Sequence, residues 1–591
     1  MPLSLDLYIS ILEQLPADRR LAQCDGVSTL VNCLSANILL RTAALVPTLW
    51  EPHYRAHYRH SEKQESRRRT ELKDNWHLMY AERRRLDKLA LQLLDAIVLQ
   101  REGRYRHAAT LTSMSFDVWD CLEIECSRPV PPILGGDSTG TPTPYALTRR
   151  FWAASILGTI AKRHAIIQWG LLTPARGNTL HSVSFVDAFS SLSCFFGKSP
   201  QEINSYLVEL GTACHSYLVK RRCPLDPEMP EYDLPGICTN ICLFMSEQGF
   251  GAVEPTRFHD ISNNFPHVYL TTIKRTIPIS LVHIFVSIAR HIGIHASPVE
   301  FPARVLVHVP SPPGSDDFLV DVYGAETKAI VSLRNDIPAM LMRLGIPPDG
   351  LAQYVSPCGA APMLLRSARN ILSSFRNDAS RSTAQAAIYA AVCIHLLLTT
   401  DVQLVTHMLS HVDLDPLYCA TFLSDLQPLL RHGGQHLLEN LCRNALEIEE
   451  QQAILVHPRT SQAQIAHYVG MVFEHRTFLY QGCIIGWEPT CPATEEWQAN
   501  NGSDQPFYHV LPLSLDGGQR YVAEDNILPI PLTRELALQF LNEVPVIPRY
   551  FSNVDLHPDS GRGRWRLSPE LQRAYPDDEH VSQIYDEFSS L

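Results

Sequence analysis

Long apolar runs are missing from this chain of 591 residues. No run reaches the roughly 20 apolar residues that a membrane-spanning helix requires, which argues against a membrane protein. The opening residues, Met-Pro-Leu-Ser-Leu-Asp, lack the basic region and apolar core of a secretory signal peptide. These absences predict an intracellular protein of the cytoplasm, the nucleus or both, with no membrane partner.

Closely paired cysteines are missing as well. The fifteen cysteines include no Cys-x-x-Cys pair, so zinc-ribbon spacing is absent. Buried free thiols are the simpler interpretation, because cysteine is among the most buried residue types. We therefore expect neither a metal nor another cofactor.

An excess of positive charge is also missing. The 50 Lys and Arg residues are outnumbered by 62 Asp and Glu, which gives a net charge of −12 and no overall attraction to phosphate backbones. The mildly basic stretch 55–106 contains the triplets Arg67-Arg68-Arg69 and Arg83-Arg84-Arg85, but 14 Lys and Arg stand there against 8 Asp and Glu. A solvated helix face with pairs of opposite charge at i,i+4 explains this stretch better than a nucleic-acid patch.

Two kinds of periodicity divide the chain. Helical spacing dominates up to about residue 460, and short β-branched and aromatic runs separated by turns follow. In the middle, a helix from Pro278 to about His291 precedes two strand-like runs at 304–309 and 318–323. The chain is therefore predicted to be multidomain and mainly α, with an α+β middle domain and a small antiparallel β-barrel near its end. The barrel strands are predicted at 468–475, 479–487, 506–512 and 519–525.

The predicted organisation has six parts. They are a helical bundle over 1–60, a charged helical linker with a Pro/Gly-rich loop over 61–146, the α+β domain over 147–350, a helical tail over 351–460, the β-barrel over 461–535 and a C-terminal extension over 536–591.

Four motifs in the predicted barrel carry a family resemblance: YVGMVFEHR, YQGCIIGWE, QPFYHVL and YVAEDN. They closely resemble the YccV/HspQ domain, often labelled hemimethylated-DNA-binding. The signature residues are Tyr468, Gly470, Gly482, Gly486, Trp487, Gln505, Pro506, Phe507, Tyr508, His509, Val510, Tyr521, Val522, Ala523, Glu524 and Asn526.

The charge of this segment disagrees with the DNA partner that the resemblance implies. Residues 461–535 hold three Lys and Arg against nine Asp and Glu, whereas phosphate contacts need cations. Trp487, Phe507 and Tyr508 could stack on bases, but core packing is the favoured interpretation. We expect a module that binds protein or serves as structure, with DNA disfavoured.

A second resemblance covers the middle domain. The stretch with Asn263-Asn264, Tyr269-Leu and KRTIPISL resembles the SirB-type transglutaminase-like core. Active members of that fold use a cysteine nucleophile, a histidine base and an orienting aspartate. Ser280 stands at the cysteine position, Arg304 at the histidine position and Asp321 at the aspartate position. Arginine stays protonated and cannot act as a base, so we expect no catalysis and an ion pair between Arg304 and Asp321 on adjacent strands.

A third resemblance lies at the N-terminus. The stretch LSLDLYISILEQLP and the later Leu49-Trp50 are similar to an F-box, which implies an apolar helical face that docks the Skp adaptor of a cullin–RING ligase. The implied docking residues are Leu5, Ile9, Leu12, Leu15 and Trp50.

The order of the three resemblances adds to each of them, because it is the arrangement of an F-box-only subfamily of animals and fungi. It implies a non-catalytic substrate-recognition subunit of an SCF-type (Skp–cullin–F-box) ubiquitin ligase, with the Skp adaptor, cullin and an unidentified substrate protein as partners. Two alternatives stay open. One is a DNA-binding protein acting through the YccV-like domain, and the other is a transglutaminase- or protease-like hydrolase that uses Ser280 or an unrecognised cysteine.

Overall fold

The chain divides into two compact units. One combines residues 1–160 with 449–591, and the other covers 161–448. The Pro/Gly-rich stretch at 129–142 lies outside the described residues. The computed structural model describes residues 3–17, 26–61, 64–128, 143–173, 183–311, 317–347, 351–375, 381–399, 415–430, 435–459, 465–490, 505–514, 518–557 and 561–589.

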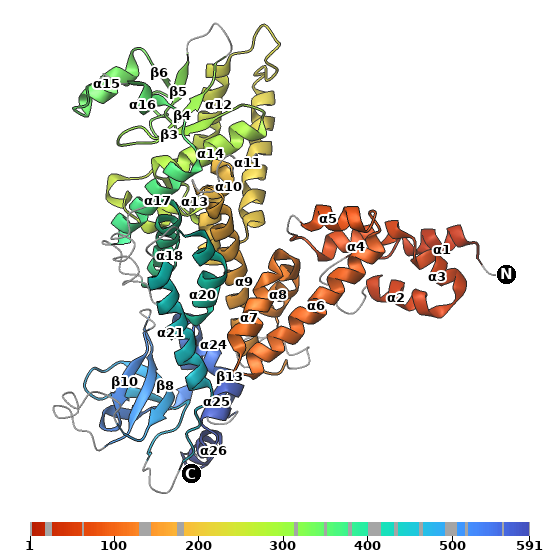
Figure 1. Cartoon of the computed structure of the whole chain (residues 1–591), viewed down its shortest axis with the longest axis vertical. Helices are drawn as coiled ribbons and strands as arrows, with labels where there is room; N and C mark the ends of the chain where they lie inside the picture. Colours follow the sequence, from red (N-terminus) through yellow and green to blue (C-terminus); the bar gives the residue numbers. More distant parts are fainter. Residues whose placement is uncertain are drawn as a thin grey trace. The chain divides into compact units, whose positions relative to one another are not determined.

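The first unit begins with a series of helices (Figure 1). Side chains of Ser4, Asn37 and Asn75 accept hydrogen bonds from the first turns of α1, α3 and α6, which satisfies backbone donors that a helix start leaves free. The elements are α1 (Leu5–Leu12), α2 (Gly26–Ala36), α3 (Ile38–Ala44), η1 (Pro47–Leu49), α4 (Trp50–His57), α5 (Gln64–Glu71), α6 (Trp76–Leu99), α7 (Arg104–Ser113), η2 (Ser115–Val118) and α8 (Trp119–Cys126).

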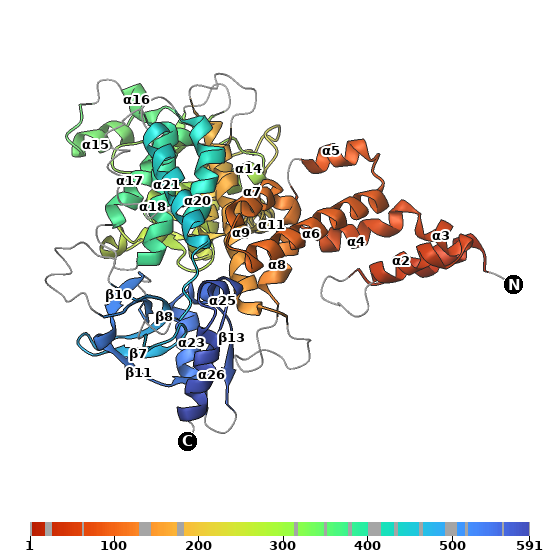
Figure 2. The same cartoon turned by 60° about the horizontal axis from the view of Figure 1, so that its bottom comes forward.

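The predicted β domain is an antiparallel sheet of five strands in the order β10-β9-β8-β7-β11. Figure 2 shows these strands with α23 and α26 beside them. The strands are β7 (Val472–His475), β8 (Gln481–Glu488), β9 (Phe507–Pro512), β10 (Arg520–Ala523) and β11 (Ile527–Pro529).

The predicted closure into a barrel is wrong for the described residues. Their sheet ends at β10 on one side and at β11 on the other. The turn η10 (Glu524–Asn526) follows β10 directly, and β11 then pairs with β7, with Ile527 opposite His475. Because only three residues separate β10 from β11, these two end strands must lie close together, so the described sheet curls toward a barrel without pairing β10 to β11.

The C-terminal extension belongs to the same core as the sheet. Leu567, Leu571 and Tyr575 are buried in one cluster with Trp487 and Tyr508. A second sheet has the order β12-β14-β13. The elements are β12 (Leu532–Thr533), α23 (Arg534–Glu543), α24 (Ile547–Tyr550), β13 (Phe551–Leu556), β14 (Arg562–Leu567), α25 (Pro569–Ala574) and α26 (Asp578–Ser589).

The second unit combines helices with a four-stranded antiparallel sheet in the order β3-β4-β5-β6. The helix predicted from Pro278 is α14, and it ends at His291 as expected. The elements are α9 (Ala146–Gly170, which begins in the first unit), α10 (Phe185–Ser190), η5 (Ser191–Phe196), α11 (Pro200–Lys220), α12 (Leu234–Glu247), β1 (Gly251–Ala252), η6 (Pro255–Arg257), η7 (Ile261–Asn264), α13 (Pro266–Tyr269), β2 (Arg275–Thr276), α14 (Pro278–His291), β3 (Ser297–Val299), β4 (Leu306–Val309), β5 (Phe318–Val320) and β6 (Ile330–Ser332).

Helices follow this sheet, as the sequence predicted. Among the described residues no helix is both long and apolar enough to cross a membrane. The mainly helical class of the chain is confirmed. The elements are α15 (Asp336–Arg343), α16 (Leu351–Val355), α17 (Ala360–Phe375), α18 (Arg381–Leu398), α20 (Pro416–Thr421), η8 (Phe422–Leu426), η9 (Gln427–Leu429) and α21 (Gln435–Ala453).

Candidate functional site

The residues expected to dock an adaptor mostly build the N-terminal bundle itself. Leu12 is only 6% exposed and Trp50 only 2%. The Trp50 indole donates a hydrogen bond to the Ala44 carbonyl at 2.7 Å. Leu5, Ile9 and Leu15 are partly buried and pack against this core. Leu12 and Trp50 therefore present almost no surface to a partner, because both are packed into the bundle core beside Leu30, Trp76 and Met79.

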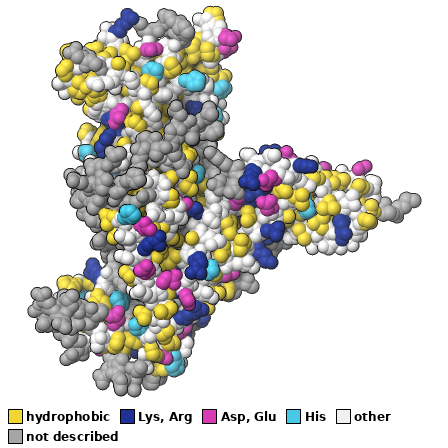
Figure 3. Space-filling model, in the orientation of Figure 1, with side chains coloured by type: hydrophobic (Ala, Val, Ile, Leu, Met, Phe, Trp, Pro, Cys, Tyr) yellow, Lys and Arg dark blue, Asp and Glu magenta, His cyan; other side chains and the backbone are white. Residues whose placement is uncertain are grey.

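A different set of apolar residues of the bundle faces solvent. Leu3, Leu7 and Ile11 are about half exposed at 44%, 46% and 51%, and Ile38 at the start of α3 is 80% exposed. Helix α1 packs against α3, and Figure 3 shows hydrophobic side chains spread over these N-terminal helices. The spacing of four between Leu3, Leu7 and Ile11 could have revealed this stripe, but α1 is apolar on both of its faces.

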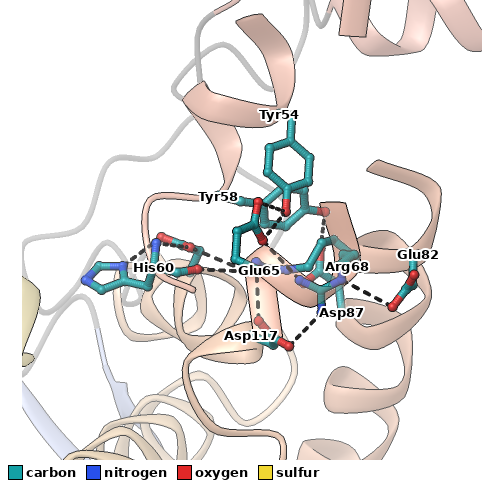
Figure 4. A network of polar contacts seen from close by, with 10 residues as sticks. Tyr54, Tyr58, His60, Glu65, Arg68, Glu82, Asp87 and Asp117 are labelled. Atoms are coloured by element: carbon teal, nitrogen blue, oxygen red, sulfur yellow. Dashed lines mark hydrogen bonds and ion pairs between the residues drawn. The ribbon is translucent and has the colours of Figure 1, made fainter. Parts of the chain in front are cut away.

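A buried ionic network lies beside the bundle (Figure 4). The Arg68 guanidinium of α5 is 5% exposed and contacts Asp117 at 2.7 Å, Glu65 at 3.1 Å and Glu82 at 3.2 Å. Breaking a buried pair by removing one partner typically costs about 3–5 kcal/mol. Glu82 belongs to α6 and Asp117 to η2, so the network joins α5 to both elements.

Arg83 of α6 extends this network. It is fully buried, lies 3.5 Å from Asp117 and 3.9 Å from Asp120, and covers the Tyr58 ring at 4.4 Å. The expected solvated helix face is therefore wrong for Arg68 and Arg83. It holds for Arg67, whose exposed pair with Glu71 at i,i+4 measures 2.6 Å. Sequence spacing could not show which arginines turn inward.

In the second unit, Ser280 is buried in the first turn of α14. Its hydroxyl donates a hydrogen bond to the Asn263 carbonyl at 2.6 Å. A serine nucleophile needs a base that accepts its proton, and here the proton is directed to a backbone oxygen. This geometry suits a hydroxyl that connects α14 to η7.

The predicted ion pair between Arg304 and Asp321 is confirmed, with Nη1 and Oδ2 2.6 Å apart. Asp321 follows β5 and also accepts a hydrogen bond from the Gly324 amide at 2.9 Å. Arg304 lies in a bend two residues before β4 rather than on the strand, which corrects its predicted position. The carboxylate that would orient a histidine base is therefore occupied by a permanent cation.

Cys242 lies near Asp321. It lines a cavity of about 110 Å³ with Phe250, Leu281 and Tyr323 among the other lining residues. Burial raises the pKa of the Cys242 thiol, and burial raises that of Cys238 to about 12. A reactive cysteine needs a lowered pKa, so neither thiol is poised as a nucleophile. Within the described residues, no group of three or more His, Cys, Asp or Glu side chains is arranged to hold a metal ion.

The YccV-like signature residues chiefly stabilise the sheet. Trp487, Phe507 and Tyr508 are buried, as expected. The Trp487 indole donates to Asp578 at 3.0 Å, and the Tyr508 hydroxyl donates to Glu524. Val510 and Val522 are buried, while Tyr468 and Tyr521 make ring contacts with Tyr585 and Phe507.

The remaining signature residues hold turns and close backbone approaches. Gly470 has a φ of +97°, and a Cβ on Gly486 would lie 2.5 Å from the Tyr575 hydroxyl. The Asn526 carbonyl accepts from the Arg476 amide at 2.9 Å. Gly482 lies against the Phe473 ring, and Ala523 pairs with Phe507 across two strands. The Gln505 side chain accepts a hydrogen bond from the Asp525 amide, and the Pro506 carbonyl accepts one from the Glu524 amide. His509 contacts Glu488 at 3.3 Å.

One exposed apolar feature of this domain was missed by sequence reasoning. Phe478 and Leu479, in the turn between β7 and β8, are 73% and 71% exposed. Adjacent exposed large apolar residues are typical of contacts with other proteins. The turn follows the motif YVGMVFEHR; Phe478 falls between two predicted strands and Leu479 at the start of the second, and neither position indicated exposure.

Two families of domain match this chain. Residues 219–359 match the transglutaminase-like superfamily, and residues 465–557 match the family described as hemimethylated DNA-binding protein YccV like. The chain therefore carries a transglutaminase-like domain followed by a YccV-like domain, as predicted. The second match ends beyond 535, within the extension whose side chains share the core of the sheet.

The chain is also similar to F-box only protein 21. It is 25% identical to the Pongo abelii protein over 359 residues, which are 56% of this chain and 53% of the relative. The values are 25% over 366 residues for Mus musculus and 24% over 364 residues for Homo sapiens, each covering 56% of this chain and 54% of the relative. The match thus spans about half the length of these relatives. No solved structure matches the chain.

Proposed function

We propose that this chain is a substrate-recognition subunit of an SCF-type ubiquitin ligase. The N-terminal bundle docks the Skp adaptor, and the downstream domains bind a substrate protein. The observation that carries the proposal is the exposed apolar stripe of Leu3, Leu7 and Ile11 with Ile38. A bundle whose core is already filled has no internal use for these side chains, and an apolar helical face fits a groove on a partner. The similarity to proteins named F-box only protein 21 supports the same function.

The predicted docking residues then take two roles. Leu12 and Trp50 keep the bundle in shape, while Leu5, Ile9 and Leu15 connect that core to the surface. Leu7, Ile11 and Ile38 make the direct contact with the adaptor. Such a role places the protein inside the cell, in the cytoplasm or the nucleus.

In this proposal no residue of the chain is catalytic, and cullin-bound subunits carry out ubiquitin transfer. The Ser280 hydroxyl is bonded to a backbone carbonyl and Arg304 neutralises Asp321, so the transglutaminase-like domain acts as a scaffold. The YccV-like domain contacts protein through its exposed Phe478 and Leu479 rather than DNA, because its surroundings are acidic.

Binding of the full chain to a purified Skp–cullin complex tests the docking face. We expect Leu7→Ser, Ile11→Ser and Ile38→Ser, combined, to weaken binding by at least about tenfold, which corresponds to about 1.4 kcal/mol. Val219→Ser is the control, because Val219 is equally exposed at 55% but lies on α11. Unchanged binding by the triple variant, or no binding by the parent chain, would contradict the proposal. Deleting 1–60 is a poorer test, because Trp76 and Met79 share the core of the bundle.

A further inference from the structure

Helix α5 is held in place by charge rather than by apolar burial. Its sequence is QESRRRTE, and among its described side chains only Arg68 is buried. Arg68 contacts Asp117, Glu82 and Glu65, and Glu65 accepts hydrogen bonds from the Tyr54 hydroxyl at 2.8 and 3.0 Å. Segments with few buried apolar contacts are among those that open locally. Because Arg68 is its one buried described side chain, the attachment of this helix depends chiefly on the buried contacts of Arg68.

The last turn of α5 contains Thr70, which directly follows three arginines in the sequence. Thr70 is exposed, and Arg67, Arg68 and Arg69 precede it. The pattern Arg-Arg-x-Ser/Thr occurs once in the sequence, because the other adjacent arginines, at 19–20, 83–85, 149–150 and 221–222, have no Ser or Thr two residues further on. Protein kinases select substrates partly by such charge patterns.

We propose that Thr70 is a phosphorylation site for a serine/threonine kinase that recognises arginines before its target, and that phosphate there releases α5. The kinase transfers the γ-phosphoryl group of ATP to Oγ1 of Thr70. A bond forms between Oγ1 and phosphorus, the bond to the bridging oxygen breaks, ADP leaves and the hydroxyl proton passes to the catalytic aspartate of the kinase. This inference does not depend on the docking of an adaptor.

Unwinding of α5 frees the Thr70 hydroxyl from its hydrogen bond within the helix. Within the helix this hydroxyl donates to the Ser66 carbonyl at 2.9 Å. Unwinding gives up the exposed pairs Arg67–Glu71 and Arg69–Asp74 together with the contacts of Arg68, but it exposes no apolar side chain of α5 itself. The three arginines are then free to enter an acidic substrate groove.

Phosphate at Thr70 opposes refolding of α5. It adds negative charge in the last turn, where the helix dipole is already negative, and next to Glu71. It also competes with Glu71 for Arg67. When Arg68 leaves the network, α5 loses its ion pair with η2, while the buried Asp117 keeps the Arg83 contact at 3.5 Å.

The test uses the full chain, ATP and the catalytic domain of a kinase with this arginine preference. Site mapping by mass spectrometry should find phosphate on Thr70, none at that position in Thr70→Ala, and unchanged incorporation in Ser66→Ala. Arg67→Ala should lose most of the incorporation, because it removes an exposed recognition arginine. Hydrogen exchange should show loss of amide protection across α5 after phosphorylation.

The variant Arg68→Ala provides the comparison for the released state. It should show the same loss of protection in α5 without phosphate, since it removes the buried contacts directly. Phosphate found only at other positions, or phosphorylated Thr70 with α5 still protected, would overturn the inference.

Discussion

The Arg304 guanidinium lies 2.6 Å from the Asp321 carboxylate, at the position where a transglutaminase-like triad would pair a histidine with its aspartate. Asp321 is buried, whereas the Arg304 side chain is 39% exposed. The pair keeps the loop before β4 attached to the end of β5.

Loss of this pair should cost a modest amount of stability. Arg304→Ala leaves Asp321 with the Gly324 amide as a donor, so we expect the free energy of unfolding to fall by about 1–2 kcal/mol. Urea unfolding measures this change. Arg257→Ala, which removes the more exposed pair with Asp260, is the control and should cost about 0.2–1 kcal/mol. Equal effects of the two variants would contradict the special role of Arg304.

The stability of the first unit should depend on acid through Glu570. Burial alone would raise the pKa of this carboxyl, but the guanidinium groups of Arg104, Arg549 and Arg101 outweigh burial and lower it to about 2, from 4.5. A lowered folded-state pKa contributes stability that is present above pH 4.5 and is lost as the pH falls toward 2.

Unfolding midpoints measured from pH 7 to pH 3 check this dependence. In Glu570→Gln the unfolding midpoint should fall less steeply between pH 4.5 and pH 3 than in the parent chain. This variant should also be less stable at pH 7, because Arg104, 1% exposed, loses its carboxylate partner at 2.6 Å. An equally steep fall in this variant would show that other carboxyls control it.

Asp578 should be essential to the YccV-like domain. Its carboxylate is fully buried and accepts from Arg459 at 2.7 Å, the Trp487 indole at 3.0 Å and the Val469 amide at 2.7 Å. Asp578→Ala leaves the Trp487 indole and the Val469 amide without this acceptor and removes the buried carboxylate partner of Arg459, so we expect a loss of about 3–5 kcal/mol. Thermal unfolding followed by tryptophan fluorescence measures it. The exposed Asp525→Ala should stay within about 0.5 kcal/mol, and a similarly small effect at Asp578 would refute the assignment.

The YccV-like domain should not bind duplex DNA through phosphate contacts. With nine carboxylates against three cations over 461–535, counterion release is too small to drive binding. Gel shifts with the full chain from about 50 to 200 mM salt should show no salt-sensitive complex. A complex that weakens steeply with salt would instead support the DNA-binding alternative.

Local patterns predicted several elements closely. The proline and apolar spacing of α14 placed its start and end, and alternation placed the strands β4, β5 and β7 to β10. The Arg304–Asp321 pair followed because opposite charges were expected on neighbouring strands. A helix or strand depends on residues that are neighbours in the sequence, and the ion pair depends on the pairing of two strands.

Other features depend on side chains that are far apart in the chain. Tyr575 packs against Trp487, which makes the extension part of the sheet domain. Arg68 reaches Asp117 while its neighbour Arg67 stays in solvent, although both belong to one triplet. Burial of a charge depends on where its partner lies in three dimensions, and sequence spacing does not contain that information.

The residues alone therefore predicted the succession of helical, transglutaminase-like and YccV-like segments, and the resemblance predicts that Ser280 and Arg304 stand at the positions of a cysteine and a histidine. Folding decided which apolar side chains of α1 fill the core and which stay exposed, because one helix carries leucines on both faces and only packing distinguishes them. Folding also left β10 and β11 as the ends of the described sheet, since the direction of the chain after η10 is set by pairing with β7.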